Sequence, residues 1–399
     1  VTIGGHIMTK IYKQFEAIAG LIQEKQGSRK QYKPLKIDYS LISSPIFISG
    51  HTRSGTTLLM RMLDGNPDIV IPPRKGKLHI LRRFAMQPHR VVYNSKDSLK
   101  ILSKMELKLS NENEKKFLKL LEFEIGKNGE IHGIIELINV LISTILNYTG
   151  QKKCFVKRWL EKNHNLEFYW GRAKFLFANP KLIYVVRDPR DVWASWKKYC
   201  IERKMPNDLD QAILNIQNHM LNEVIEWAYK INRFSTQDEF IQYYNIEATS
   251  FNKLIDMLMN IEITKYNREK LIRIDEFRSI NTPSGRFAWN YFIMLQRAAW
   301  LAKEFNHDVM LIRYEDIVSK PQESISQILT FCDLHAGEGA VIPTEQGKPW
   351  VANSSFDSGK MGSINSTSVG RWKNILDQND VNIIESIAYA EYSAVNCIN

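Results

Sequence analysis

The sequence predicts an α/β fold: a three-layer sandwich in which a central, mostly parallel sheet is covered by helices on both faces. Three strand-turn-helix units carry this prediction. Each pairs an apolar run with a segment of helical periodicity: PIFISG and TTLLMRML (residues 45–63), PKLIYVV and RDPRDVWASWKKY (180–199), and DVMLIRY and EDIVSKPQESISQILTF (308–331). Strands that alternate with helices favour a parallel sheet, because each crossover needs a helix.

Residues at the turns support these units. Asp188 is the expected N-cap of the helix in the second unit, with Pro189 at the first helical position. In the third unit Pro321 lies near the start of a helix. Both prolines therefore mark the amino ends of helices that follow strands.

Helical insertions are expected between the units, at about residues 95–150 and 201–286. Apolar spacing also predicts an amphipathic helix over residues 9–25. The apolar segment 131–146 falls short of the roughly 20 residues that span a bilayer, so a packed helix is predicted there. Residues 345–368 are rich in Gly, Ser and Asn, which predicts a long loop.

The chain is expected to form one elaborated domain. The opening VTIGGHIM resembles a vector-derived remnant, so residues 1–7 are expected to be foreign and the domain to cover residues 8–399. The four cysteines, Cys154, Cys200, Cys332 and Cys397, are scattered singly. The segment after Met8 has no apolar region of the kind found in secretory signals. Together with the scattered cysteines, this predicts reduced thiols in a cytoplasmic protein.

The composition of the 399 residues, 44% hydrophobic and 24% charged, is that of a globular protein rather than a disordered or fibrous one. A net charge of +11 favours anionic partners. Nucleic acid, acidic membranes and phosphorylated small molecules would all satisfy that preference. A basic stripe with interleaved aromatic residues is not apparent in the sequence, so a nucleic-acid partner is not expected.

The segment FISGHTRSGTTLL, residues 47–59, has the glycine spacing of a phosphate-binding P-loop, G-x-x-x-x-G-K-[ST]. Such a turn directs backbone N–H groups and the helix dipole at one point, which suits a phosphate. Thr56, however, stands where the motif has lysine, and the nearest cation is Arg53. A kinase or NTPase needs that lysine for the outer phosphates, so this class is disfavoured but stays open.

A second anion site is predicted after the second apolar strand. Arg187 lies at the end of the strand and directly before a helix, and Ser195 follows about two turns along that helix. A guanidinium, free helix N–H groups and a hydroxyl together suit a phosphate. Two phosphate sites at the carboxyl ends of strands in one sheet predict a nucleotide with phosphates at both ends.

Four segments in chain order resemble the motifs of one family. HTRSGTTLL, VVRDPRDVWASW, RYEDIVSKPQESISQILTFCDL and VGRWKNIL resemble sulfotransferases that use 3′-phosphoadenosine 5′-phosphosulfate (PAPS). The resemblance implies in-line transfer of a sulfuryl group from PAPS to a hydroxyl or amine, release of 3′-phosphoadenosine 5′-phosphate (PAP), and no metal requirement. The implied acceptor is a small molecule or a glycan.

The resemblance also implies roles for individual residues. Arg53 matches the family's lysine near the bridging oxygen, and Ser54, Gly55, Thr56 and Thr57 match the loop that holds the 5′-phosphate. Arg187 and Ser195 match the 3′-phosphate motif. Gly370, Arg371 and Trp372 match a C-terminal loop that closes on the same phosphate, although VGRWK departs from the signature of the cytosolic branch.

The general base is expected in RWLEKNHN. Lys162 and His164 have the spacing of the family's Lys-Thr-His, in which histidine accepts the acceptor's proton, and histidine titrates near neutrality. Glu161 stays a second candidate, because Glu161-Lys162 also matches a Glu-Lys-Thr-Pro pattern and Asn163 fits neither pattern.

Two further groups have open interpretations. The basic residues Arg74, Lys75 and Lys77 indicate an acidic acceptor or form a solvated loop. Trp289, Tyr291 and Phe292 include candidates for stacking on adenine, although aromatic residues at this spacing are more often core.

Overall fold

The computed structural model describes residues 39–72, 92–93, 111–128, 131–151, 156–164, 166–202, 282–335, 341–350 and 364–395. Several sequence predictions lie outside these residues: the remnant at 1–7, the helix at 9–25, the basic cluster from Arg74 to Lys77, and most of the insertion at 201–286.

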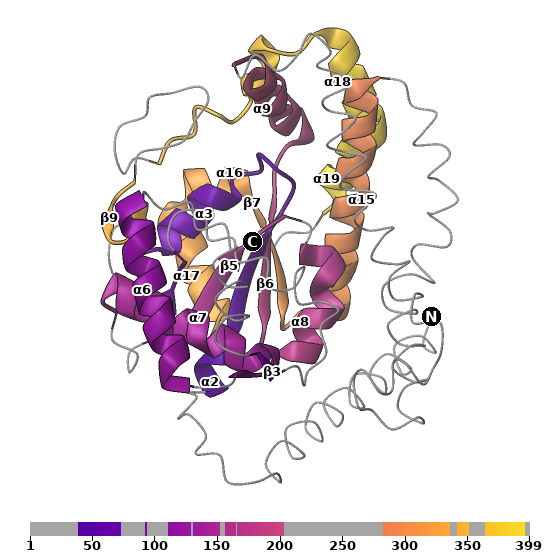
Figure 1. Ribbon diagram of the computed structural model, residues 1–399. Helices are drawn as coiled ribbons and strands as arrows, with labels where there is room; N and C mark the ends of the chain where they lie inside the picture. Colours follow the sequence, from indigo (N-terminus) through magenta and orange to yellow (C-terminus); the bar gives the residue numbers. More distant parts are fainter. Residues whose placement is uncertain are drawn as a thin grey trace, which may run out of the picture.

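The described residues form a five-stranded sheet in the order β2-β5-β1-β6-β7 (Figure 1). Its strands are β1 (Pro45–Ser49), β2 (Ile69–Val70), β5 (Arg158–Lys162), β6 (Lys181–Val186) and β7 (Val309–Arg313). Every neighbouring pair in this sheet is parallel. The predicted α/β fold with a mostly parallel central sheet is confirmed.

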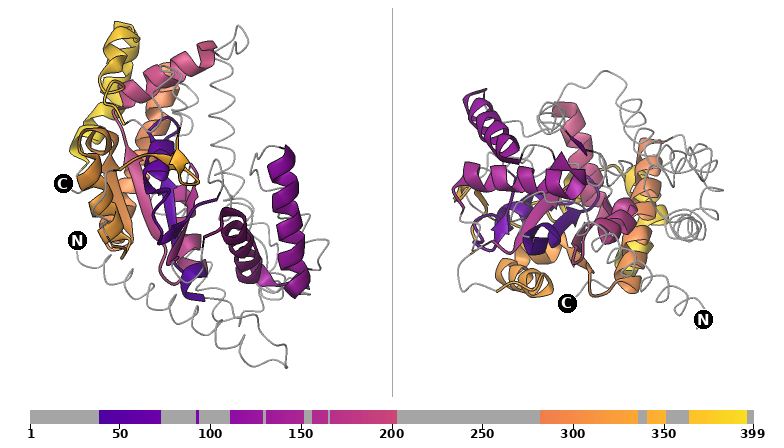
Figure 2. Two further views of the ribbon diagram at one scale, coloured as in Figure 1. Left: turned by 90° about the vertical axis from the view of Figure 1, so that its left-hand side faces the viewer. Right: turned by 60° about the horizontal axis from the view of Figure 1, so that its bottom comes forward.

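Helices cover both faces of the sheet. On one face α3 (Thr56–Leu63), α16 (Tyr314–Ser319) and α17 (Pro321–Phe331) pack on side chains such as Ile183 and Val185. On the other face α7 (Gly133–Thr149), α8 (Trp170–Leu176) and α15 (Pro283–Glu304) pack on Leu182, Tyr184 and Val186. Alternate side chains of β6 therefore pack into hydrophobic cores on opposite faces of the sheet. Figure 2 shows the sheet between these helix layers.

One strand of the sheet has no clear signal in the sequence. Within RWLEK, the charged residues Arg158, Glu161 and Lys162 interrupt the apolar pattern. All five residues of β5 are nevertheless buried, and the strand pairs with β1. Arg158 is accommodated because it donates to the carbonyl of Asn179 and to the carboxylate of Asp333, at 2.9 and 2.8 Å.

The remaining helices lie around this sandwich. The stretch predicted as a helical insertion at 95–150 contains α6 (Asn111–Asn128) and α7, with the short antiparallel pair β3 (Val92–Tyr93) and β4 (Ile131–His132) beside them. The short helices α2 (Tyr39–Ile42) and η1 (Leu166–Tyr169) flank β1 and β5. No helix within the described ranges combines the length and apolar character needed to cross a membrane.

The C-terminal segment packs on α9 (Pro189–Glu202), which follows β6. It comprises η3 (Arg371–Asn374), α18 (Gln378–Ile384), the π-helical η4 (Glu385–Tyr389) and α19 (Ala390–Ala394). The indole N–H of Trp193 donates to Asp380 at 3.0 Å and so joins α9 to α18.

The predicted loop at 345–368 begins differently from expectation, in a short hairpin of β8 (Thr344–Glu345) and β9 (Lys348–Pro349). The hairpin is fixed to α3, because Arg61 donates to Glu345 at 2.6 Å and Thr344 donates to Asp64 at 3.0 Å. Residues 351–363 of the predicted loop lie outside the described residues.

Candidate functional site

The predicted site residues meet at the carboxyl edge of the sheet. β1 lies between β5 and β6, so the loops after these three strands leave the sheet side by side. The loop after β1 and the start of α3 contain Arg53 to Thr57. Lys162 is the last residue of β5 and His164 lies just beyond it, whereas Arg187 comes directly after β6. The strand order changes direction at β1, and ligands of open α/β sheets bind at such a switch point.

The loop from Gly50 to Gly55 has a backbone that requires glycine at both ends. Gly50 and Gly55 have φ of 145° and 95°. A Cβ at Gly50 would lie 2.6 Å from the carbonyl oxygen of Val185, and a Cβ at Gly55 would lie 2.2 Å from the ring of Tyr314. Helix α3 begins at Thr56, so its first N–H groups, which lack intrahelical partners, come directly after this turn.

Buried polar groups support the loop from inside the protein. Ser49, the last residue of β1, donates to Glu167 at 2.6 Å and accepts from the main-chain N–H of Leu166 at 3.2 Å. Burial raises the pKa of Glu167 to about 7. His51 packs against the ring of Phe287, and burial lowers the pKa of His51 to about 4. His51 is therefore neutral at physiological pH, and Glu167 titrates near pH 7.

Lys162 and His164 both contact the loop after β1. The Nζ of Lys162 donates to Thr57 Oγ1 at 3.2 Å, so a buried ammonium from β5 lies beside the start of α3. His164 Nδ1 lies 3.1 Å from the carbonyl oxygen of Gly50. A carbonyl only accepts, so Nδ1 carries the proton in this contact, and in a neutral imidazole the basic nitrogen is then Nε2.

Glu161 points to the opposite face of the sheet from Lys162. Side chains alternate along a strand, and Lys162 faces α3, so Glu161 faces the α7 and α8 layer. The side chain of Glu161 is fully buried there. The two candidates for the base therefore lie in different environments, with His164 beside the loop after β1 and Glu161 in the sheet core.

Arg187 lies against the loop after β1. Its Nη1 donates to the carbonyl of Arg53 at 2.9 Å, and its Nη2 donates to the carbonyl of Ser368 at 2.8 Å. The guanidinium carbon lies 4.3 Å from the centroid of the Tyr314 ring. Only 7% of Arg187 is exposed, and its Nε is buried without a hydrogen-bond partner among the described residues.

Arg53 extends from the loop after β1 toward α9. Its Nε donates to Ser195 Oγ at 3.0 Å, and its guanidinium carbon lies 5.3 Å from the centroid of the Tyr199 ring. The two predicted anion sites therefore share a side-chain contact as well as the Arg187 contact to the Arg53 carbonyl. Arg53 itself adopts a left-handed backbone, with φ of 76°.

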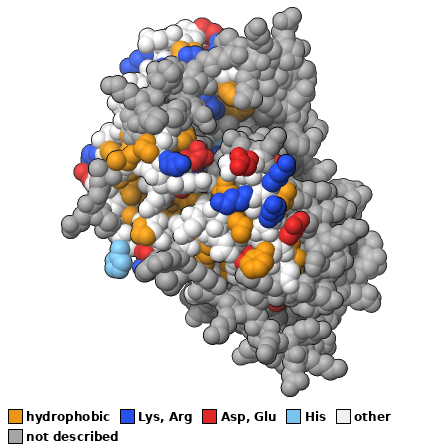
Figure 3. All heavy atoms as spheres, turned by 60° about the vertical axis from the view of Figure 1, so that its left-hand side comes forward, with side chains coloured by type: hydrophobic (Ala, Val, Ile, Leu, Met, Phe, Trp, Pro, Cys, Tyr) orange, Lys and Arg blue, Asp and Glu red, His pale blue; other side chains and the backbone are white. Residues whose placement is uncertain are grey.

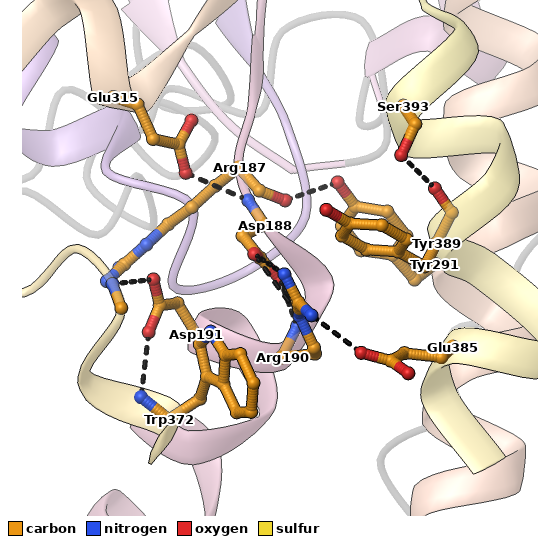
Figure 4. Close-up of polar contacts among 11 residues, drawn as sticks. Arg187, Asp188, Arg190, Asp191, Tyr291, Glu315, Trp372, Glu385, Tyr389 and Ser393 are labelled. Atoms are coloured by element: carbon orange, nitrogen blue, oxygen red, sulfur yellow. Dashed lines mark hydrogen bonds and ion pairs between the residues drawn. The ribbon is translucent and has the colours of Figure 1, made fainter. Parts of the chain in front are cut away.

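Two residues hold the main chain at the end of β6, and neither role was anticipated from the sequence (Figure 4). The hydroxyl of Tyr291 donates to the carbonyl of Arg187, and Glu315 Oε1 accepts from the N–H of Asp188 at 3.0 Å. Burial raises the pKa of both groups. Tyr291, one of the three aromatic residues considered for stacking on adenine, is only 3% exposed and is therefore a core residue. Asp188 caps α9 as predicted and accepts from the N–H of Arg190 at 2.8 Å.

The C-terminal loop at Gly370 crosses the first turn of α9. Asp191 accepts from the main-chain N–H groups of Gly370 at 2.7 Å and of Trp372 at 3.0 Å (Figure 4). Arg371 donates to the carbonyl of Thr367 at 3.1 Å and to its hydroxyl at 3.0 Å. Gly370 and Trp372 are thus bound to Asp191 through their backbone N–H groups. The guanidinium of Arg371, the third predicted residue, bonds to Thr367 in the same turn.

The sequence contained partial signals for these additional residues. Tyr314 and Glu315 lie in the RYED segment, and Asp191 lies in VVRDPRDVWASW, so motif matching indicates their segments but not their partners. Ser368 lies in a region without periodicity and has no sequence signal.

The surface facing the viewer in Figure 3 is mixed in charge. Lys and Arg side chains of its described residues lie next to Asp and Glu side chains rather than forming one basic stripe. Within the described residues, no cluster of three or more His, Cys, Asp or Glu side chains is arranged to hold a metal ion. Cys332 is a free, buried thiol.

A sequence model described as the sulfotransferase family matches residues 45–242. No curated protein matches the chain. Similar solved structures include the sulfotransferase domain from the curacin biosynthetic pathway, 18% identical, covering 87% of this chain and 98% of that chain with a TM-score of 0.40. The sulfotransferase domain from the Synechococcus PCC 7002 olefin synthase is 15% identical, covering 90% and 98% with a TM-score of 0.41. Retinol dehydratase in complex with androsterone and inactive cofactor PAP is 14% identical, covering 91% and 84% with a TM-score of 0.35.

Proposed function

Because the chain belongs to the sulfotransferase family, we propose that it transfers a sulfuryl group from PAPS to a hydroxyl or amine of a small-molecule or glycan acceptor and releases PAP. The observation that carries the proposal is the 2.9 Å hydrogen bond from Arg187 to the carbonyl of Arg53. It joins the loop after β1 to the loop after β6, which supports the proposal that one nucleotide has a phosphate at each of the two predicted anion sites.

The residues present suit such a nucleotide. The buried Nε of Arg187 has no hydrogen-bond partner among the described residues, and a 3′-phosphate beside it would supply one. Cβ atoms at residues 50 and 55 would meet Val185 and Tyr314, so glycine is required for this loop backbone, whose N–H groups would bind the 5′-phosphate in the proposed complex. Thr56 and Thr57 begin α3, where helix N–H groups favour a 5′-phosphate.

Sulfuryl transfer spreads negative charge over the moving group and the departing phosphate. In the proposed reaction Lys162, which donates to Thr57, and Arg53 would offset this charge. Arg53 would act only as a cation, because arginine does not release its proton in proteins. When bound, PAPS would supply the activated sulfuryl group.

His164 is the proposed general base for in-line attack by the acceptor. Its Nδ1 donates to the carbonyl of Gly50, so Nε2 is the basic nitrogen of the neutral ring and would accept the acceptor's proton. Glu161 is kept as the second candidate, although its position in the sheet core separates it from the loop that would bind the phosphosulfate.

One observation is also compatible with a nucleoside triphosphate as the ligand. The ammonium of Lys162 lies beside Thr57, so a lysine from β5 could contact outer phosphates although Thr56 replaces the P-loop lysine. The alternative function is thus a P-loop kinase or NTPase. Ligand-dependent thermal stability distinguishes the two proposals, because a ligand that binds only the folded chain raises the melting temperature.

We would measure melting temperatures with PAP and with ATP plus magnesium, and product formation from PAPS by mass spectrometry. PAP at about 100 times its Kd should stabilise the wild type by about 2.7 kcal/mol. Arg187→Ala should abolish that shift. Arg158→Ala is the matched control, since Arg158 is also buried but begins β5 at the opposite edge of the sheet. This control should lose stability and keep the PAP shift. Equal shifts with ATP and PAP would favour the kinase, and no PAP shift would refute the proposal.

A further inference from the structure

Asp191 connects α9 to the C-terminal loop. Its Oδ2 accepts from the N–H of Gly370 at 2.7 Å, and its Oδ1 accepts from the N–H of Trp372 at 3.0 Å. Only 2% of Asp191 is exposed. Both carboxylate oxygens are therefore committed to main-chain donors 179 and 181 residues later in the chain.

The same loop also contacts the predicted 3′-phosphate site. Ser368 accepts from Arg187 through its carbonyl at 2.8 Å, and its hydroxyl lies 2.6 Å from the hydroxyl of Tyr314. Two residues later Gly370 turns the chain with φ of 71° into η3. Asp191 thus fixes the part of the loop that comes directly after its contact with Arg187.

We propose that Asp191 is a positioning residue that holds the loop from Ser368 to Trp372 over Arg187 and so completes the 3′-phosphate pocket. The inference rests on the proposed function, because it concerns one end of the proposed nucleotide. Asp191 need not contact the ligand. It acts through the backbone of the loop.

The chemistry of the contact favours a carboxylate. Hydrogen bonds from N–H groups to an ionised acceptor are shorter and stronger than neutral ones. Burial raises the pKa of Asp191, whereas the two loop N–H groups and the nearby Arg187 favour its ionised form. Asp191 also lies in the first turn of α9, where the helix dipole favours negative charge. An asparagine has one accepting oxygen and would turn its NH₂ toward a second donor, so it can satisfy one of the two loop N–H groups.

The loop has a second attachment to α9, through the ring of Trp372. Arg190 lies between the rings of Trp372 and Tyr389, 4.2 and 4.1 Å from their centroids, and pairs with Glu385 at 2.6 Å. This contact holds the side of the loop that faces η4. Loss of the Asp191 bonds should therefore loosen the loop at Gly370 without releasing the C-terminal helices.

Comparison of two nucleotides tests this role. PAP and adenosine 5′-monophosphate (AMP) share the 5′-phosphate, and only PAP has the 3′-phosphate. Asp191→Asn should weaken PAP binding about ten-fold, which corresponds to about 1.4 kcal/mol of binding free energy, and should leave AMP binding unchanged. The preference for PAP over AMP should therefore fall about ten-fold as well. Asp191→Glu, which keeps both oxygens, should restore part of that preference.

Asp377→Asn is the matched control. Asp377 also accepts a main-chain hydrogen bond near the C-terminus, from Asp380 at 2.8 Å, but it caps α18 and not the loop over Arg187. It should leave the preference for PAP unchanged. An Asp191→Asn preference equal to that of the wild type would overturn the inference, whereas a wild type that binds AMP but gains nothing from the 3′-phosphate would refute the proposed function itself.

If Asp191→Asn does not fold, hydrogen exchange in the wild type decides. PAP should slow exchange of the N–H groups in residues 367–372, and AMP should not. Equal exchange with both nucleotides would overturn the inference.

Discussion

The ring of Tyr314 lies 4.3 Å from the guanidinium carbon of Arg187, measured to the ring centroid. The same ring occupies the space beside Gly55, and the Tyr314 hydroxyl lies 2.6 Å from that of Ser368. One side chain thus contacts the loop after β1, the loop after β6 and the C-terminal loop. These contacts are possible because the tyrosine of RYED comes directly after β7, the strand next to β6.

The two contacts of Tyr314 can be separated by substitution. Tyr314→Phe removes the hydroxyl contact to Ser368 and should lower the free energy of unfolding by about 1 kcal/mol, with little change in PAP affinity. Tyr314→Leu also removes the ring beside Arg187, a cation–π contact of about 2 kcal/mol when desolvated, and should weaken PAP binding at least ten-fold. Urea denaturation and calorimetric titration measure the two effects. Equal PAP affinities for both variants would show that the ring does not position Arg187.

Gly55→Ala should be severely destabilising. The new Cβ would lie 2.2 Å from Cδ2 of Tyr314 at a φ of 95°, so backbone strain and overpacking together should cost about 2–5 kcal/mol. Gly347→Ala is the control, because Gly347 has φ of 73° but nothing within 4 Å of a Cβ. It should cost about 1 kcal/mol. Similar losses in thermal denaturation would contradict the close approach of Tyr314 to the loop.

The choice between the two candidate bases is testable by kinetics. His164→Gln should lower kcat about 10²–10⁴-fold and leave the PAP Kd unchanged, because a general base acts on the acceptor and not on the nucleotide. Glu161→Gln should change kcat far less, since Glu161 lies in the sheet core. The reverse ranking of the two variants would assign the base to Glu161.

Glu167 should make stability depend on pH. Its pKa is about 7 in the folded protein against an ordinary 4.5, because of burial. Between these values the unfolded chain loses its proton first, so the folded state loses stability as pH rises from 4.5 to 7, by about 3 kcal/mol in all. Glu167→Gln does not ionise and can still accept from Ser49. The variant should therefore become more stable than wild type as pH rises through this window, in urea denaturation at pH 5 and pH 8. Parallel pH curves would contradict the shifted pKa.

Local patterns predicted the parts of the fold that depend on local physics. The apolar runs at β1, β6 and β7, the proline at the start of α9 and the proline at the start of α17 all mark elements where the sequence places them. The strand β5 was missed because its charged residues are buried by partners distant in sequence, such as Asp333 for Arg158, 175 residues away.

The candidate site likewise has parts that the local sequence predicts and parts that depend on tertiary packing. Glycine spacing and the arginine before α9 indicate two anion-binding turns, since both depend on the backbone within a few residues. The contacts from Asp191, Tyr291, Glu315 and Ser368 to these turns could not be read locally, because they join segments brought together only by the packing of the sheet and its C-terminal helices.

The strand-helix units built on β1, β6 and β7, the glycine turn after β1 and the type of charge at each predicted anion site can all be predicted from the amino-acid sequence. Three-dimensional packing was needed to establish that the two turns touch, that Lys162 and His164 contact the same loop, and that Asp191 bonds to the C-terminal segment beside Arg187. Turns and helix ends follow from short-range sterics and hydrogen bonding, whereas side-chain partners across the sheet depend on the order in which parallel strands pair.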